Sequence, residues 1–450
     1  MNHYDRGMSA FDGLFVPAEL RAAVSSRAWL EAMLDAERAL VNAGASAGTV
    51  PAHLATEIAD ACDPERFDLE QLVEAGRAVG NPAEPLVRAL AGSVGDAAAQ
   101  YVHRGATSQD IVDTAAMLVS RRALVLVLGE ADRVSAATAT LARDHRETLM
   151  VARTVLQHAV PTTFGLKAAG WLTAVVEARL GLEQVSRERL AAQLGGAAGT
   201  LAGFGDGGIR LLEHYARELD LQVPTLPWHS NRTRVAELGA ALTTAAGVAA
   251  KIALDLVLLA QTEVAEVAEG GGTGRSSTMP QKHNPIGSML ARANARLATA
   301  HATVLLGSLE QEHERAAGAW QAEWEALVGT LAHTGGALHA LAGALESLEV
   351  DAARMRQNLD LTGGLVMAER ISFLLMDRLG RGEAQEVVRE AAGADGSFRE
   401  ALLADPRVGL GPDELDAALD PSTYLGSAGQ LVDRALAFYE SSRQPNEVDE

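Results

Sequence analysis

The chain has 450 residues, of which 48% are hydrophobic and only 4% aromatic, and its formal net charge at pH 7 is -21. This charge argues against nucleic acid and anionic membranes as partners, because both require clustered lysine and arginine. The abundance of alanine and leucine favours an all-α fold in two or three structural units. The single cysteine, Cys62, excludes an intrachain disulfide and a cysteine metal cluster, and fits a reducing cytoplasm.

Residues 1–108 are predicted to form an N-terminal helical domain. Its first long helix follows Ser25 and Ser26, a good pair of N-capping residues, and has apolar side chains every three or four positions. Shorter helices are expected beyond it, separated at Pro51, Asp63–Pro64, Gly80–Asn81–Pro82 and Pro85. Residues 1–15 lack a basic region before an apolar run, so we expect no signal peptide.

Residues 109–348 are predicted to form a central bundle of long helices. Residues 349–450 are predicted to form a C-terminal domain of shorter helices, with breaks at Gly380, Gly382, Gly393, Pro406 and Pro412. The helical patterns of the bundle cover 110–149, 163–193, 232–268, 286–313 and 323–347, which corresponds to helices about 40 to 50 Å long. Residues 238–260 are apolar nearly all round, and such a helix needs neighbours on most sides. We therefore expect an oligomer rather than a self-sufficient monomer. The longest uncharged run, 238–250, is too short to span a membrane.

Residues 270–285 read GGGTGRSSTMPQKHNP and are predicted to form a lid over a ligand site. The glycines let the backbone move and bring N–H groups close to a ligand. Ser276 and Ser277 offer hydroxyls, while Lys282 and Asn284 supply a cation and an amide. This combination suits the binding of a carboxylate.

Another anion site is predicted where the first long helix of the bundle begins. Thr107 and Ser108 can cap this helix, and helix N-termini bind anions through free N–H groups. His103 lies at the edge of the same stretch.

The stretch SSTMPQKHNP resembles the signature loop of the fumarase/aspartase superfamily. The resemblance implies three helical domains and a homotetramer with a twenty-helix core, whose active sites combine loops of different subunits. It also implies that Ser276 is the base that removes a proton alpha to a carboxylate, and that Lys282 and Asn284 hold that carboxylate. The Thr107–Ser108 pair would contact a substrate carboxylate. Arg275 stands where the family has glycine.

Residues 153–163 resemble the second signature of the superfamily, and Gln157 and His158 are the predicted substrate-binding residues in it. Val155 occupies the position at which relatives keep a histidine, and Met289 the position of its glutamate partner. Expelling hydroxide or an amine requires a proton donor, which typically contributes about 10²- to 10⁴-fold, whereas a carboxylate leaves as an anion. The loss of both partners therefore favours the opening or closing of a lactone. Relocation of the acid to His103, His158 or His229 is the competing explanation.

Further stretches resemble the 3-carboxy-cis,cis-muconate cycloisomerase family, including VGNPAEPLV at 79–87, HERAAGAWQAEWEAL at 313–327 and NLDLTGGLVMAER at 358–370. This resemblance implies the interconversion of 3-carboxy-cis,cis-muconate and gamma-carboxymuconolactone in the beta-ketoadipate pathway, without a cofactor. It adds Asn81 and Arg315 to the predicted substrate-binding residues. The tricarboxylate substrate needs several cations, for which Lys282 and Arg315 are favoured over Arg232 and Arg234, whose alternative role is a helix start with salt bridges. We expect no metal, because His229 has no second ligand at metal spacing.

Two rival functions are carried forward. The first is an adenylosuccinate-type lyase that eliminates fumarate, against which Val155 and Met289 weigh. The second is a non-catalytic structural member of the superfamily, against which the intact Ser276, Lys282 and Asn284 weigh.

Overall fold

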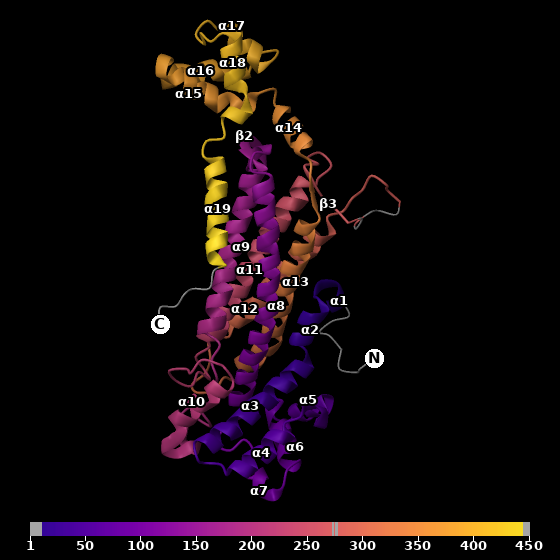
Figure 1. The fold of residues 1–450 in the computed structure, drawn as a ribbon, viewed down its shortest axis with the longest axis vertical. Coiled ribbons are helices and arrows are strands. Elements are labelled where there is room, and N and C mark those ends of the chain that lie inside the picture. Colours follow the sequence, from indigo (N-terminus) through magenta and orange to yellow (C-terminus); the bar gives the residue numbers. More distant parts are fainter. Residues whose placement is uncertain (1–10, 272–273, 275–277, 444–450) are drawn as a thin grey trace. The chain divides into compact units, whose positions relative to one another are not determined.

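A computed structural model describes residues 11–271, 274 and 278–443, and helices dominate it (Figure 1). The N-terminal helices are α1 (Asp12–Phe15), α2 (Ala18–Ala23), α3 (Ser26–Ser46), α4 (Ala52–Ala61), η1 (Pro64–Arg66), α5 (Leu69–Gly76), α6 (Ala83–Gly92) and α7 (Asp96–Ala99). The predicted cap of α3 is confirmed, because the Ser25 hydroxyl accepts a hydrogen bond from the N–H of Ala28. The break expected at Pro85 is wrong. Pro85 lies in the first turn of α6, where backbone N–H groups have no helical partner in any case.

Five long helices follow the predicted bundle: α8 (Ser108–Asp144), α9 (Phe164–Glu188), α11 (Thr233–Leu259), α12 (Ile286–Gly307) and α13 (Ala319–Glu346). The predicted patterns of α8, α9, α11 and α12 extend past the observed C-terminal ends, and α13 begins before residue 323. At 37 residues, α8 is about 55 Å long. Helix η2 (Ala202–Gly207) and α10 (Gly208–Glu218) lie between α9 and α11 in the sequence.

Four short strands accompany the helices and were not expected from the sequence. Strands β1 (Leu149–Thr154) and β2 (Gln157–Thr163) form an antiparallel hairpin with a register shift between Val151 and Arg153. Strands β3 (Val267–Glu269) and β4 (Leu348–Val350) form a second antiparallel pair. The fold class remains all-α, since these strands are small additions to the helices.

The C-terminal helices are α14 (Ala352–Asp360), η3 (Leu365–Met367), α15 (Ala368–Leu379), α16 (Arg381–Ala392), α17 (Phe398–Ala404), α18 (Pro412–Leu419), η4 (Pro421–Thr423) and α19 (Ala428–Ser442). A core of buried side chains that includes Ile371, Val387 and Leu415 holds α15 to α18 together. The break predicted at Gly382 is wrong, because Gly382 is the second residue of α16. The breaks at Gly380, Gly393 and Pro412 agree with helix ends.

The chain divides into two compact units. Unit 1 comprises Met1–Asp132, Glu177–Lys251 and Leu290–Leu341, and unit 2 comprises Arg133–Val176, Ile252–Met289 and Ala342–Glu450. The five long helices each contribute residues to both units. The three-domain division at residues 108 and 348 stays a prediction.

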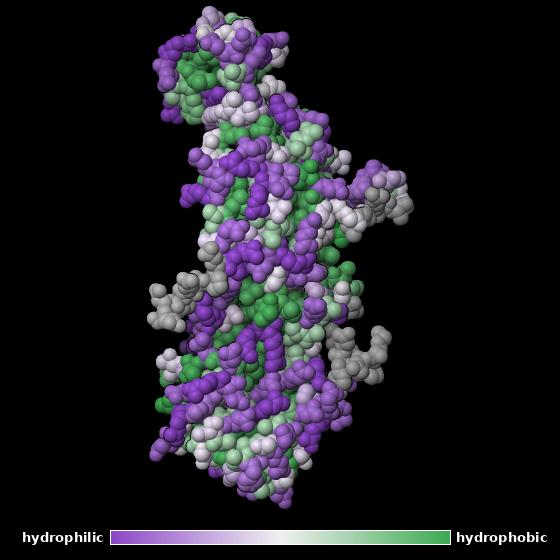
Figure 2. Space-filling model, viewed as in Figure 1, coloured by the Kyte–Doolittle hydropathy of each residue, from purple (hydrophilic) through white to green (hydrophobic). Residues whose placement is uncertain are grey.

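Helix α11 is long and apolar enough to cross a membrane by length and composition alone, and 44% of its most apolar stretch is buried within the structure. A core helix of a bundle has the same properties. Hydrophobic surface also lies along the long helices in Figure 2, interrupted by hydrophilic strips.

Candidate active site

The start of α8 is shaped by Asp110, which is fully buried. Its Oδ2 accepts a hydrogen bond from the N–H of Thr107 at 3.0 Å, and its own N–H donates to the Thr107 carbonyl at 2.9 Å. The N–H groups of Ser108 and Gln109 have no partner among the described residues. Among the described residues, Ser108 and Gln109 therefore present free N–H donors at the positive end of a long helix, as an anion site requires, whereas the Thr107 N–H is used by Asp110.

The loop before α8 packs against a glycine-rich turn that follows α9. Gly105 has a φ of +82°, and a Cβ at this position would lie 2.8 Å from the ring of Phe204. The carbonyl of Gly105 also lies close to Gly196, where a Cβ would meet it at 2.7 Å. Only glycine fits these positions, so the backbone of the turn approaches the start of α8 closely.

His103 also belongs to this loop and has a φ of +55°. Its Nδ1 lies 2.6 Å from Oε1 of Glu37 on α3, and the Glu37 side chain is 1% exposed. Burial alone would lower the pKa of His103, but the Glu37 carboxylate outweighs burial and the pKa is raised. Glu37 therefore holds the imidazole of His103 in place in the loop before Thr107 and Ser108.

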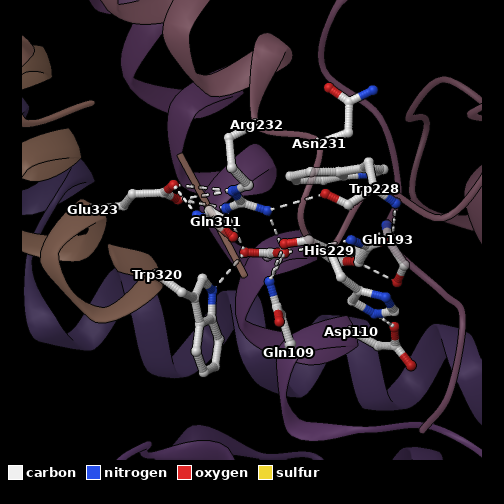
Figure 3. A network of polar contacts seen from close by, with 12 residues as sticks. Gln109, Asp110, Gln193, Trp228, His229, Asn231, Arg232, Gln311, Trp320 and Glu323 are labelled. Carbon is white, nitrogen blue, oxygen red and sulfur yellow. Dashed lines mark hydrogen bonds and ion pairs between the residues drawn. The ribbon is translucent and has the colours of Figure 1, made fainter. Parts of the chain in front are cut away.

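A buried ionic network lies one turn further along α8 (Figure 3). The Arg232 guanidinium donates to both oxygens of Asp113, at 2.7 and 2.9 Å, and to Glu323 at 2.5 to 3.1 Å. The Trp320 indole also donates to Asp113 at 2.9 Å, and the ring of Trp228 lies 4.8 Å from the Arg232 guanidinium carbon. The alternative role predicted for Arg232, a residue at a helix start with salt bridges, therefore agrees with the structure. The residue is only 2% exposed, however, so its salt bridges are buried and not solvated.

Arg315 contacts the glycine-rich turn. Its guanidinium donates to the carbonyls of Gly196 at 2.6 Å, Ala197 at 3.2 Å and Glu314 at 2.7 Å. Burial lowers the pKa of Arg315, while Asp110 and Asp113 act in the opposite direction. The charge of Arg315 is therefore held beside the turn that packs against the start of α8. Arg234 instead donates to the carbonyl of Arg189 at 3.0 Å.

Asn81 caps α6 through its side chain, whose Oδ1 accepts from the N–H groups of Ala83 and Glu84. It also lines a cavity of about 590 Å³, together with residues that include Trp29 and Trp324. Among the predicted site residues that the structure describes, Asn81 alone lines this cavity. A contact between Asn81 and substrate stays a prediction.

In unit 2, Gln157 and His158 begin β2 directly after the hairpin turn. Val155 and Leu156 form this turn, and both have positive φ, at 51° and 63°. Val155 is 95% exposed. A β-branched residue in this conformation is an outlier, so the turn is strained. Burial lowers the pKa of His158, and the nearby Arg153 lowers it further.

The hairpin is tied down by charge close to its turn. Arg153, two residues before the turn, donates to both oxygens of Glu266, at 2.9 and 2.7 Å, and Asn358 donates to the same carboxylate at 2.7 Å. Glu266 is fully buried. The hairpin is therefore fixed next to its exposed, apolar tip.

The predicted lid is described only in part. Ser276 and Ser277 lie outside the described residues. Asn284 ties the C-terminal end of the loop to Gly274 within it, since its backbone N–H and its side-chain amide both donate to the Gly274 carbonyl, at 3.0 and 3.1 Å. Lys282 is exposed.

The carboxylate of Glu269 accepts from the N–H groups of Gly287 and Ser288 and from the Ser288 hydroxyl, at 2.6 to 2.9 Å. Glu269 therefore caps α12 directly after the loop. Met289, in the same first turn, is 50% exposed. No charged partner for a catalytic histidine stands at that position.

The predicted site residues fall into two groups. Unit 1 holds Asn81, His103, Thr107, Ser108 and Arg315, and unit 2 holds Gln157, His158, Lys282 and Asn284. Across residues 11–271, 274 and 278–443, no cluster of three His, Cys, Asp or Glu side chains has the geometry of a metal site.

Sequence reasoning did not assign roles to Glu37, Glu269 or the Asp113–Arg232–Glu323 network. One signal was available, because Glu37 interrupts the otherwise buried apolar face of α3. Another was the Thr-Ser-Gln-Asp order at 107–110, which has the spacing of a capping box, and Asp110 does accept from the N–H of Thr107.

Comparisons with known proteins place the chain among the lyases. The family model described as "Lyase" matches residues 17–298, and the model "Adenylosuccinate lyase C-terminus" matches residues 364–435. A nitrosuccinate lyase of Streptomyces davaonensis is 49% identical, over 93% of this chain and 92% of that protein. A 3-carboxy-cis,cis-muconate cycloisomerase of Bradyrhizobium diazoefficiens is 45% identical, over 93% of this chain and 95% of that protein.

Among solved structures, the 3-carboxy-cis,cis-muconate lactonizing enzyme of Pseudomonas putida superposes with a TM-score of 0.91. It is 39% identical, and the match covers 97% of this chain and all of that one. Family model, relatives and fold thus agree with the signature motifs. The chain belongs to the fumarase/aspartase superfamily of lyases.

Proposed function

We propose that the protein is a cycloisomerase that interconverts 3-carboxy-cis,cis-muconate and gamma-carboxymuconolactone. In the lactone-opening direction, Ser276 takes the proton alpha to a carboxylate. The negative charge that develops is held by Lys282, Asn284 and the N–H groups at the start of α8, and the ring carboxylate departs. In the lactonising direction the steps reverse. The chemistry is proton transfer with charge stabilisation and needs no cofactor.

The observation that carries this proposal is the apolar pair at the positions of the family's charged relay. Val155 is 95% exposed at the hairpin tip, and Met289 is half exposed in the first turn of α12. Neither side chain can protonate a leaving group. A carboxylate departs as an anion at neutral pH, so the reaction proceeds without that donor. Relatives of 40 to 45% identity named 3-carboxy-cis,cis-muconate cycloisomerase support the same substrate.

The binding groups also suit a tricarboxylate. The N–H groups of Ser108 and Gln109, which have no partner among the described residues, offer positive potential in unit 1, and His103 lies in the loop before them. Lys282 adds an exposed cation in unit 2. Arg315 is the further candidate, and Gln157, His158, Asn81 and Ser277 complete the proposed contacts. We propose that a homotetramer assembles each site from several subunits, as the resemblance to the superfamily implies.

A second candidate function is the elimination of nitrite from nitrosuccinate, which the relative of 49% identity favours. Nitrite is the anion of an acid about as strong as a carboxylic acid, so it also leaves without protonation. The absence of the relay therefore suits both reactions and argues against an adenylosuccinate-type elimination, whose leaving group is an amine.

The decisive assay offers the purified protein each substrate separately. Loss of the ultraviolet absorbance of the conjugated diene reports lactonisation of 3-carboxy-cis,cis-muconate, and release of nitrite reports the elimination. We expect lactonisation to be the faster reaction by at least about tenfold in kcat/KM. Nitrite release at the higher kcat/KM would replace the proposed function with the second candidate, and turnover of neither would favour a non-catalytic member.

Ser276→Ala tests the base, and we expect a loss of at least about 10³-fold in kcat. Lys282→Met tests the carboxylate contact, with Lys251→Met as a matched control, since Lys251 is exposed on α11. We expect Lys282→Met to lose at least about 10²-fold in kcat/KM and the control to stay within about twofold. Near-full activity of Ser276→Ala would remove the proposed mechanism.

The tetramer itself is tested by light scattering after size-exclusion chromatography. Exposed apolar side chains on α11 and α12, namely Leu254, Leu297, Val304 and Leu306, support assembly through these helices. A mass of four chains is the expected result, and a monomer at micromolar concentration would contradict it. We place the enzyme in the cytoplasm, in agreement with its single, buried cysteine.

A further inference from the structure

One buried carboxylate joins two segments of backbone that are far apart in the sequence. Asp110 Oδ1 accepts from the N–H of Gly195 at 2.9 Å, and Oδ2 accepts from the N–H of Gly196 at 2.9 Å and from that of Thr107 at 3.0 Å. The Nε2 atom of His229 lies 2.6 Å from Oδ1. The four acceptor positions of the carboxylate are thus all used, and Asp110 is fully buried.

These contacts place Asp110 between two groups of the proposed substrate site. On one side, it consumes the N–H of Thr107 and leaves those of Ser108 and Gln109 free. On the other side, it holds Gly196, whose carbonyl accepts from Arg315 at 2.6 Å. A movement of Asp110 would therefore displace the helix start and Arg315 together.

His229 contacts the same carboxylate through its side chain, as Figure 3 shows. It is 4% exposed, and its carbonyl accepts from the Gln109 side chain at 2.8 Å. A Cβ at Gly195 would lie 2.6 Å from the imidazole, so the glycine-rich turn packs directly on the ring. The backbone of such a turn is flexible by itself, and these contacts hold it in one conformation.

We propose that Asp110 and His229 are positioning residues that hold the start of α8 and Arg315 in the geometry that binds a substrate carboxylate. The proposal rests on the proposed function for the identity of the substrate. Asp113, three residues along the same helix, has a different role. Its partners are the side chains of Arg232, Trp320, Gln109 and Gln193, so it stabilises the fold without contacting the backbone of Thr107 or Gly196.

The experiment compares Asp110→Asn with the matched control Asp113→Asn in the full-length protein. Both replace a buried carboxylate of α8 by an amide of the same shape, and both lose acceptor capacity. The readouts are the dissociation constant of tricarballylate, a non-reacting tricarboxylate, by calorimetry, and KM and kcat with the reacting substrate. Circular dichroism and the melting temperature report the fold.

We expect Asp110→Asn to weaken tricarballylate binding and to raise KM by at least tenfold. Asp113→Asn should keep both within threefold, although its melting temperature falls as far or further. If Asp110 only stabilised the fold, both variants would weaken tricarballylate binding in proportion to the fall in their melting temperatures. That result, or unchanged tricarballylate binding in Asp110→Asn, would overturn the proposal.

Variants of His229 provide the second measurement if Asp110→Asn does not fold. His229→Gln keeps an N–H donor near the position of Nε2, whereas His229→Phe keeps a ring and removes the donor. We expect the glutamine variant to bind tricarballylate within threefold of wild type and the phenylalanine variant to bind at least tenfold more weakly. Equal binding by both would contradict the role of His229.

Failure of the proposed function gives a different pattern. If wild type binds tricarballylate but does not lactonise carboxymuconate, and Asp110→Asn still binds tenfold more weakly, the positioning role stands and the proposed reaction falls. If wild type does not bind tricarballylate at all, the positioning proposal is refuted whatever the enzyme converts.

Discussion

Replacement of Arg232 by methionine tests the energetics of the buried ionic network. The variant removes the only guanidinium between Asp113 and Glu323, among the described residues, and fills a similar volume. Asp113 keeps the Trp320 indole and the Gln109 amide as donors. Within the part of the chain that the structure describes, Glu323 keeps only the Gln311 amide, at 3.1 Å. The variant therefore leaves a poorly compensated carboxylate at a position that is 3% exposed.

The magnitude follows from the protonation of that carboxylate. Burial already raises the pKa of Glu323 in the wild type, against the effect of Arg232. Without the guanidinium the pKa rises further, and Glu323 folds in its neutral form. Protonating a glutamate of reference pKa near 4.3 at pH 7 costs about 4 kcal/mol, since one pKa unit corresponds to about 1.4 kcal/mol. This value agrees with the loss of about 3–5 kcal/mol that is typical when one partner of a buried ion pair is removed.

The loss depends on pH with a defined sign. A carboxyl group whose pKa is higher in the folded than in the unfolded protein destabilises the folded state as the pH rises above the unfolded pKa, because the unfolded chain then releases a proton that the folded protein keeps. The deficit of Arg232→Met should therefore grow by about 2–3 kcal/mol between pH 5.5 and 7.5. Adding Glu323→Gln to the variant removes the titrating group and should abolish most of this growth.

Equilibrium unfolding in guanidinium chloride at one protein concentration measures these differences, since subunit assembly makes stability depend on concentration. Arg234→Met is the matched control. Arg234 is only partly buried and donates a single hydrogen bond, so about 1 kcal/mol is expected. A deficit of Arg232→Met below about 1 kcal/mol, or one that is the same at pH 5.5 and 7.5, would refute the reasoning.

Three further predictions concern the loops around the site. His103→Gln should be less stable than the wild type, and the difference should be largest below pH 6.5, where the wild-type ion pair with Glu37 is complete. Burial lowers the pKa of His103 but Glu37 raises it more, so the ion pair is lost, and the difference shrinks, as the pH rises above that raised pKa. Unfolding at pH 5.5 and pH 9 measures this difference. The double variant Val155→His with Met289→Glu restores the family's relay. Because the carboxylate leaves without protonation, kcat for lactonisation should change by less than about threefold. A rise of about 10²-fold would contradict this departure of an unprotonated carboxylate. Glu269→Ala should lower the free energy of unfolding by about 1–2 kcal/mol and speed amide hydrogen exchange in the first turn of α12. Unchanged exchange there would show that Glu269 does not cap this helix.

The sequence alone was sufficient for the helical architecture and the superfamily. Long apolar periodicity predicted α8, α9, α11, α12 and α13, because a 3.6-residue repeat is a local property of the chain. Capping was equally local, so Ser25 was placed correctly. Errors arose where the position within a helix decides the outcome, as for Pro85, which a first turn tolerates.

Only the tertiary structure decided which residues act together. The contacts of Asp110 with Gly195 and His229 join positions more than 80 residues apart, and no local pattern predicts such a pairing. The same holds for Glu37 with His103 and for Arg232 with Asp113 and Glu323. The sequence by itself determined the fold and the chemical groups available, since periodicity and motifs are written along the chain. The structure decided which charges are buried and paired, because burial and pairing depend on segments that meet only after folding.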